Sequence, residues 1–115
     1  MDDLTKLQRQ YDSALNDLEK YSVSCSEREA TFKNLDSTTK SMLAVQYNIF
    51  QSTAGTQKDR EMRALSSQAY LTHLLALGEV RHEFLAQRAL KEVAQAKCEY
   101  CRTQISTERA KIGLR

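Results

Sequence analysis

The chain has 115 residues and a formal net charge of +2, with 41% hydrophobic and 28% charged residues; this composition is too apolar for a disordered chain, and the small net charge alone does not point to a nucleic-acid partner. Proline is absent and only three glycines occur, so a single domain of nearly continuous helix is expected. No apolar run approaches the roughly 20 residues that cross a bilayer, and the polar start MDDLTKLQRQ lacks the apolar core of a secretory signal, which predicts a cytoplasmic protein without membrane association.

The first predicted element is a helix over residues 2–50. Its apolar side chains recur in alternating steps of three and four residues, which is the heptad spacing of a coiled coil. These seam positions are Leu4, Leu7, Tyr11, Ala14, Leu18, Tyr21, Cys25, Arg28, Phe32, Leu35, Thr39, Met42, Gln46 and Ile49. Arg28 is unusual among them: a polar seam residue either selects register or partner, or lays its stem along the core with its head in solvent.

Two interruptions of the helical pattern are predicted, one within the first long helix and one at its end. Hydroxyl side chains in DSTTKS, residues 36–41, compete for backbone hydrogen bonds and predict a bend or local break. Residues 51–57 predict a loop, in which Gly55 suits a helix C-terminal cap. Thr56 and Asp59 resemble a capping box that starts a short helix over residues 58–65.

A second long helix is predicted over residues 67–112, capped by Ser66 or Ser67. At 100° per residue it carries two apolar stripes, and such a helix needs two partners. One stripe contains Tyr70, Leu74, Leu77, Val80, Phe84, Cys98, Cys101 and Ile105. The other contains Leu71, Leu75, Leu85, Ala89, Val93, Ala96 and Tyr100.

These elements predict an all-α fold, an elongated antiparallel helical hairpin of the coiled-coil type that assembles into an oligomeric bundle. The first helix covers one stripe of the second helix. The other stripe is covered by a second copy of the chain, or by the segment around residues 36–41 turning back. Because a lone two-helix hairpin buries little surface, we expect a homodimer. The expected interface residues are Leu71, Leu75, Leu85, Val93 and Tyr100, together with Arg28.

Cys98 and Cys101 form a CxxC spacing within the second predicted helix. Zinc requires four ligands, and Cys25, His73 and His82 do not complete the set within one hairpin, so a metal site would need two chains. A redox CxxC pair opens a helix after a strand, and no strand is expected. The spacing therefore favours two small buried apolar residues without metal or other cofactor, with a zinc-stapled scaffold as an alternative.

No catalytic motif is found, so an enzyme is not expected. The last helix carries basic residues that could contact nucleic acid: Arg88, Lys91, Arg102, Arg109 and Lys111. Glutamates are interleaved with them, which favours intrahelical pairing on a solvated face over a nucleic-acid footprint.

The second half of the sequence has a recognisable pattern over residues 58–114. It combines Asp59-Arg60-Glu61, then Ser66 with Tyr70, and a closing Arg102-Thr103…Ser106-Thr107-Glu108-Arg109. This pattern resembles small coiled-coil proteins of tailed phages and prophages, which are often encoded near single-strand annealing recombination proteins. The resemblance implies a protein of the host cytoplasm but no defined activity.

The expected function is that of a non-enzymatic coiled-coil interaction factor. The resemblance implies a phage accessory protein that docks on a recombination or replication protein, or on a host protein. Direct DNA binding through the basic C-terminal helix is the alternative.

Overall fold

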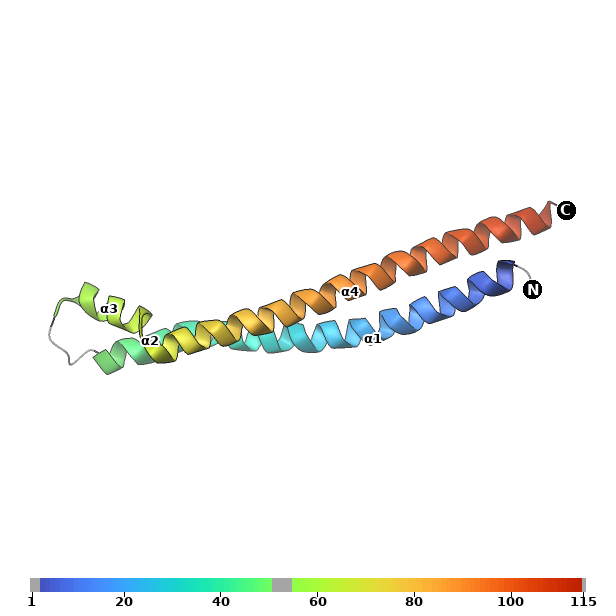
Figure 1. Cartoon of the computed structure of the whole chain (residues 1–115). Coiled ribbons are helices and arrows are strands. Elements are labelled where there is room, and N and C mark those ends of the chain that lie inside the picture. Colours follow the sequence, from blue (N-terminus) through green and yellow to red (C-terminus); the bar gives the residue numbers. More distant parts are fainter. Residues whose placement is uncertain (1–2, 51–54, 115) are drawn as a thin grey trace. The chain divides into compact units, whose positions relative to one another are not determined.

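A computed structural model describes residues 3–50 and 55–114, and these form helices without any strand. The helices are α1 (Asp3–Ser37), α2 (Thr39–Phe50), α3 (Gln57–Leu65) and α4 (Gln68–Gly113) (Figure 1). The predicted all-α class is confirmed. Residue 2 of the first expected helix and residues 51–54 of the expected loop lie outside the described residues.

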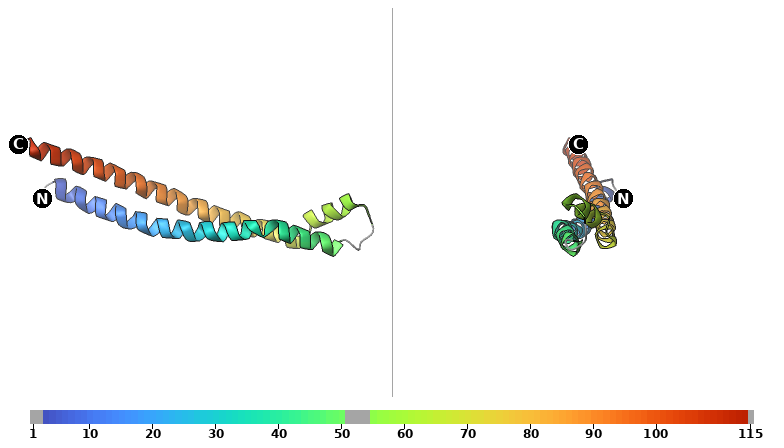
Figure 2. Two further views of the ribbon diagram at one scale, coloured as in Figure 1. Left: turned by 180° about the vertical axis from the view of Figure 1, so that it is seen from behind. Right: turned by 90° about the vertical axis from the view of Figure 1, so that its left-hand side faces the viewer.

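The chain divides into two compact units, each containing parts of the first and second halves of the sequence. Unit 1 consists of Met1–Glu27 and Leu85–Arg115, and unit 2 is Arg28–Phe84. Within unit 1, α1 and α4 lie side by side and run in opposite directions (Figures 1 and 2). Within unit 2, α2 packs against α3. The antiparallel hairpin pairing that the sequence predicts is therefore present.

The heptad seam of the first half is buried as predicted. Every seam position from Leu4 to Gln46 is buried or half-buried, apart from Arg28. Ile49, at the end of the series, is 57% exposed. Burial in steps of three and four residues is the pattern that coiled-coil packing produces.

The buried face of α4 contains the stripe predicted for it except Leu74, and it includes further residues that the prediction left out. It follows Tyr70, His73, Leu77, Val80, Phe84, Gln87, Lys91, Ala94, Cys98, Cys101, Ile105 and Glu108. Leu74, which the 100° wheel places inside, is 38% exposed, whereas His73 is only 8% exposed. A wheel with 3.6 residues per turn drifts by about 20° per heptad from a strict seven-residue repeat. Despite this drift, the predicted residues at the far end of the helix, Cys98, Cys101 and Ile105, remain on the buried face.

The interruption between α1 and α2 lies at Thr38, within the hydroxyl-rich segment. The Ser37 hydroxyl donates to the carbonyl of Asn34 at 2.8 Å, and the Thr38 hydroxyl donates to the carbonyl of Leu35 at 2.7 Å. Such side-chain bonds to the preceding turn bend helices. The segment does not turn back over α4, because Thr39 continues the heptad series on the inner side. The alternative in which this segment covers the second stripe is therefore wrong.

The start of α3 has the predicted capping box. The Thr56 hydroxyl accepts from the backbone N–H of Asp59 at 3.2 Å, and the Asp59 carboxylate accepts from the N–H of Thr56 at 3.1 Å. Gly55 has φ +131°, and a Cβ there would meet the Asp59 side chain at 3.1 Å. Gly55 therefore lies against the start of α3, whereas the residues that would join it to α2 as a C-terminal cap, 51–54, lie outside the described residues.

One of the two serines proposed as cap does begin α4. The Ser67 hydroxyl accepts from the backbone N–H of Tyr70 at 3.2 Å and donates to the carbonyl of Ala64 at 2.9 Å. Ser66 instead ends α3, with its hydroxyl donating to the carbonyl of Met62 at 2.8 Å. The two neighbouring serines thus separate the two helices.

Candidate interaction surfaces

Helix α4 presents an apolar face to solvent in unit 1, which we call the α4 outer face. Leu85, Val93 and Tyr100 are 44%, 53% and 63% exposed, and Ala89 and Ala96 are exposed between them. These five residues recur every three or four positions, so they share one side of the helix. The structure therefore leaves uncovered the stripe that the sequence assigns to an interface.

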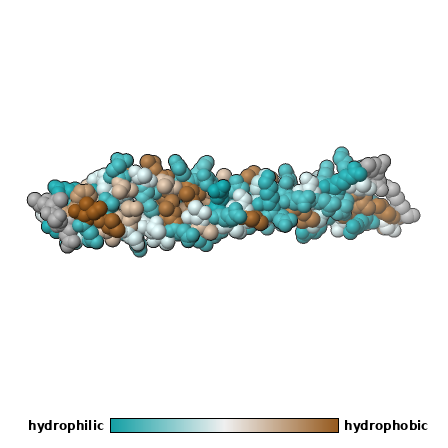
Figure 3. Space-filling model, turned by 90° about the horizontal axis from the view of Figure 1, so that it is seen from below, coloured by the Kyte–Doolittle hydropathy of each residue, from teal (hydrophilic) through white to brown (hydrophobic). Residues whose placement is uncertain are grey.

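Unit 2 carries further exposed apolar side chains. Leu71 and Leu75 of α4, both proposed as interface residues, are 43% and 71% exposed. Figure 3 shows apolar side chains gathered on the surface of unit 2 around α2. Val45 and Ile49 of α2 are both more than half exposed. Contiguous exposed apolar surface of this kind marks interaction sites.

Arg28, the charged seam residue, reaches solvent and pairs across to α4. Its Nη1 lies 3.2 Å from Oε2 of Glu83, and the two side chains are 50% and 54% exposed. Phe32, one turn later, stacks on Phe84 with ring centroids 5.9 Å apart. An exposed ion pair of this kind contributes at most about 1 kcal/mol to stability, and the neighbouring aromatic contact adds apolar packing.

A polar pair lies inside the seam of unit 2, and sequence reasoning did not find it. The Thr39 hydroxyl lies 3.0 Å from Nε2 of His73, and His73 is 8% exposed. Gln46, also on the inner side, is equally buried. Thr39 and Gln46 were recognisable as polar seam positions, whereas a heptad count along α4 was needed to place His73 opposite them.

The three cysteine thiols are free and buried in the described structure. Cys98 and Cys101 are 2% and 6% exposed, and they lie on the inner face of α4 with Ile105. Among the described residues, no three His, Cys, Asp or Glu side chains lie together in a way that could hold a metal ion. The two cysteines occupy positions suited to small apolar packing residues.

Two of the five candidate nucleic-acid contacts are paired with glutamates within α4, and a third is half-buried. Arg88 lies 3.3 Å from Glu92, and Lys111 lies 3.3 Å from Glu108. Lys91 is half-buried on the inner face. Arg102 and Arg109 remain exposed and line one groove of unit 1.

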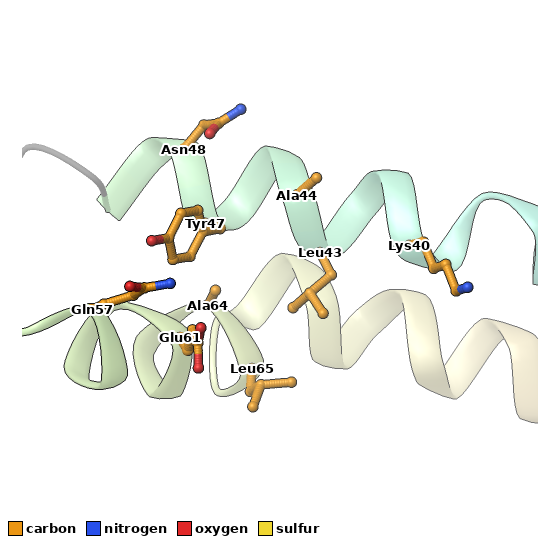
Figure 4. Close-up of a pocket in the computed structure, with 9 residues that line it drawn as sticks. All are labelled: Lys40, Leu43, Ala44, Tyr47, Asn48, Gln57, Glu61, Ala64 and Leu65. Carbon is orange, nitrogen blue, oxygen red and sulfur yellow. The ribbon is translucent and has the colours of Figure 1, made fainter.

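A pocket of about 480 Å³ lies between α2 and α3 in unit 2. Leu43 and Tyr47 point from α2 toward α3, opposite Ala64 and Leu65 (Figure 4). Lys40, Gln57 and Glu61 provide polar groups around it. The pocket depends on how α2 and α3 pack against each other, which a sequence pattern does not specify.

None of the helices in the described part of the chain combines the length and apolar character that a membrane span requires. Comparisons of the sequence with models of protein families, with curated proteins and with solved structures find no match.

Proposed function

We propose that the protein is a non-enzymatic helical interaction factor that self-associates through the α4 outer face. The proposal rests on the small number and small size of the apolar side chains that a single chain buries. Its buried apolar residues, within the described parts, are Ala14, Cys25, Ala64, Ala94, Cys98, Cys101 and Ile105. Only Ile105 among these is a large side chain, while Val93 and Tyr100 are more than half exposed. A stable helical protein needs to bury more apolar surface than such a core provides.

The partner that fits the α4 outer face best is the same face of a second chain. Closed dimers use one surface twice, so that residue i contacts residue j and j contacts i. The five residues of the face are arranged symmetrically about its middle: Leu85 and Tyr100 stand at the ends, with Ala89 and Ala96 inside them. An antiparallel copy therefore pairs a large residue with a large one at each end, while paired alanines let the helices approach closely.

Charge at the centre of the face is compatible with this pairing. Glu92 lies next to Val93, and its carboxylate is already paired with Arg88 of the same helix at 3.3 Å. The dimer therefore does not need to bury an uncompensated charge, which would be costly.

The test compares two valines that are almost equally exposed, Val93 on α4 at 53% and Val23 on α1 at 56%. We expect analytical ultracentrifugation to show a dimer for the unmodified chain and for Val23→Glu. Val93→Glu would bury a carboxylate at the centre of the interface, so its dimer should dissociate at least about a hundredfold more readily. A monomeric unmodified chain, or equal weakening by both variants, would overturn the proposal.

The resemblance of residues 58–114 to phage coiled-coil proteins extends the proposal to a second protein partner. The partner that this resemblance suggests is a single-strand annealing recombination protein. Co-sedimentation of that purified protein with the unmodified chain tests the extension, with the Val93→Glu variant showing whether the dimer is the binding form. Absence of co-sedimentation would contradict the proposed accessory role but not the proposed self-association.

A further inference from the structure

One groove of unit 1 is lined by basic and hydroxyl side chains, and no carboxylate is among its lining residues. It lies between the start of α1 and the end of α4. It is lined by Gln8, Tyr11, Arg102, Ile105, Ser106 and Arg109. We call it the Arg102–Arg109 groove.

The two arginines lie on one side of α4 with Ser106 between them. Seven residues separate them, so their Cα atoms are about 10 Å apart along the helix. Side chains at i, i+4 and i+7 share a helix face, so Arg102, Ser106 and Arg109 lie on one side of α4, and all three line the groove. Long arginine side chains at this spacing can converge on one anion between them.

Neither guanidinium is neutralised by an ion pair within the described chain. The ion pairs of this part of α4 join Arg88 to Glu92 and Lys111 to Glu108. The nearby carboxylate of Asp12 accepts a hydrogen bond from the Gln8 amide at 3.2 Å. Arg102 and Arg109 thus keep their donors available, although interleaved acids elsewhere on α4 pair with other bases.

The groove suits a phosphate group better than a carboxylate. Its volume is about 290 Å³, roughly ten times the share of one water molecule in the liquid, so it has room for a phosphate and part of its carrier. Guanidinium groups bind phosphate oxygens with paired, charge-assisted hydrogen bonds. The Ser106 and Tyr11 hydroxyls can donate to a third oxygen, which a phosphate has and a carboxylate lacks.

We propose that the Arg102–Arg109 groove binds a phosphate group, held by both guanidinium groups and by the hydroxyls of Ser106 and Tyr11. The phosphate comes either from free phosphate and nucleotides or from a nucleic-acid backbone. This site is separate from the α4 outer face and does not depend on the dimer.

The first experiment titrates inorganic phosphate into the full chain at constant ionic strength and follows backbone amide and arginine side-chain NMR signals. We expect saturable shifts at Ser106 and Arg109. The double variant R102Q/R109Q should weaken binding at least about tenfold, since hydrogen bonds from a charged group contribute about 1.5–3 kcal/mol. The matched control R81Q/R88Q removes the same charge from the same helix and should bind phosphate within about twofold of the unmodified chain, because its arginines lie outside the groove.

The second experiment separates the sources of the phosphate. Fluorescence anisotropy with a labelled 20-nucleotide single strand measures whether a polymer binds more tightly than inorganic phosphate. A nucleic-acid ligand contacting both arginines should give a log–log salt slope of about −1.4 that R102Q/R109Q abolishes. Strand binding no tighter than inorganic phosphate assigns the groove to free phosphate or nucleotides.

Three results would overturn the site. They are the absence of saturable phosphate shifts in the groove, equal weakening by both double variants, and equally tight binding of polyglutamate. Equal weakening by both double variants would mean that phosphate is attracted by the overall positive charge of the helix. Equally tight binding of polyglutamate would mean that the groove binds acidic protein surfaces.

Discussion

At the scale of single residues, the pair formed by Thr39 and His73 has the clearest consequence for specificity. The Thr39 hydroxyl lies 3.0 Å from Nε2 of His73, which is almost fully buried. Polar residues in a coiled-coil seam select one register, because any shift leaves them without a partner. This pair joins the start of α2 to the start of α4, so it holds the closed end of the hairpin within unit 2.

Replacing Thr39 by valine tests that role. Thr39→Val keeps the branched shape but leaves the His73 ring nitrogen without its partner, which should lower the free energy of unfolding by about 1–3 kcal/mol. Urea unfolding followed by circular dichroism measures the change. Thr103→Val is the matched control: the Thr103 hydroxyl donates only to the carbonyl of Glu99 in its own helix, so its effect should stay within about 0.5 kcal/mol. Equal stability of Thr39→Val and the unmodified chain would contradict the role.

Asp59 gives the start of α3 a dependence on pH. Hydrogen bonds from the backbone N–H and then the hydroxyl of Thr56 lower the pKa of the Asp59 carboxyl from its ordinary value of 3.8, and Arg63 lowers it further. A lowered pKa in the folded state means that the carboxylate stabilises the cap above pH 3.8 and that this contribution is lost as pH falls through the folded value. Stability of the cap therefore decreases on acidification.

Amide hydrogen exchange and NMR shifts of Thr56 and Asp59 follow this transition directly. We expect the capping shifts of the unmodified chain to disappear as the pH falls through the lowered pKa of Asp59, with a midpoint below the ordinary value of 3.8. Asp59→Asn cannot titrate, so the same amides should show no such step. A step of equal size in Asp59→Asn would assign the transition to other groups.

At the scale of elements, the first half of the chain was predictable because its pattern is a strict heptad. The seam from Leu4 to Gln46 needed no structural information, and the hydroxyl run around Thr38 located the break. In α4 the seam includes His73, Gln87 and Lys91. A search for apolar positions passes over these residues because their side chains are polar or charged.

The candidate surfaces also differ in how far they could be predicted from the sequence alone. The exposed stripe of α4 follows from spacing, so Leu85, Val93 and Tyr100 could be named from the sequence. The Arg102–Arg109 groove could not, because Gln8 and Tyr11 reach it from the other helix. The pairing of Arg88 with Glu92, in contrast, is a local i, i+4 contact that interleaved charge predicts. Surfaces formed by residues far apart in the sequence are therefore the ones that sequence patterns did not predict.

The orientation of the two α4 helices in the dimer can be tested by cross-linking. In an antiparallel dimer Val93 lies near the two-fold axis, so Val93→Cys should form a disulfide-linked dimer on mild oxidation. Leu85 then faces Tyr100 of the other copy, and its distance from the second Leu85 exceeds the roughly 7 Å that a disulfide spans. Leu85→Cys alone should stay unlinked, whereas L85C/Y100C should link. Efficient linking by Leu85→Cys alone would indicate a parallel dimer.

At the scale of the whole molecule, folding and assembly should be linked. The buried apolar residues of the described chain are almost all small, while large residues such as Leu75, Val93 and Tyr100 remain exposed. The proposed dimer would cover the α4 outer face and add apolar burial to the core of each copy. The stability of such a protein depends on its concentration, because association favours the folded form.

Thermal unfolding should therefore shift with protein concentration. A hundredfold increase in concentration changes the free energy of a dimer by about 2.7 kcal/mol, which for a dimer of this length raises the melting temperature by roughly 5–10 °C. The Val93→Glu variant should melt at a lower temperature with little dependence on concentration, since its copies do not associate. Val23→Glu should behave like the unmodified chain, because α1 lies outside the proposed interface. A melting temperature of the unmodified chain that stays constant over this range would mean that the hairpin folds alone, and its exposed apolar face would then have to be stable in water without a partner.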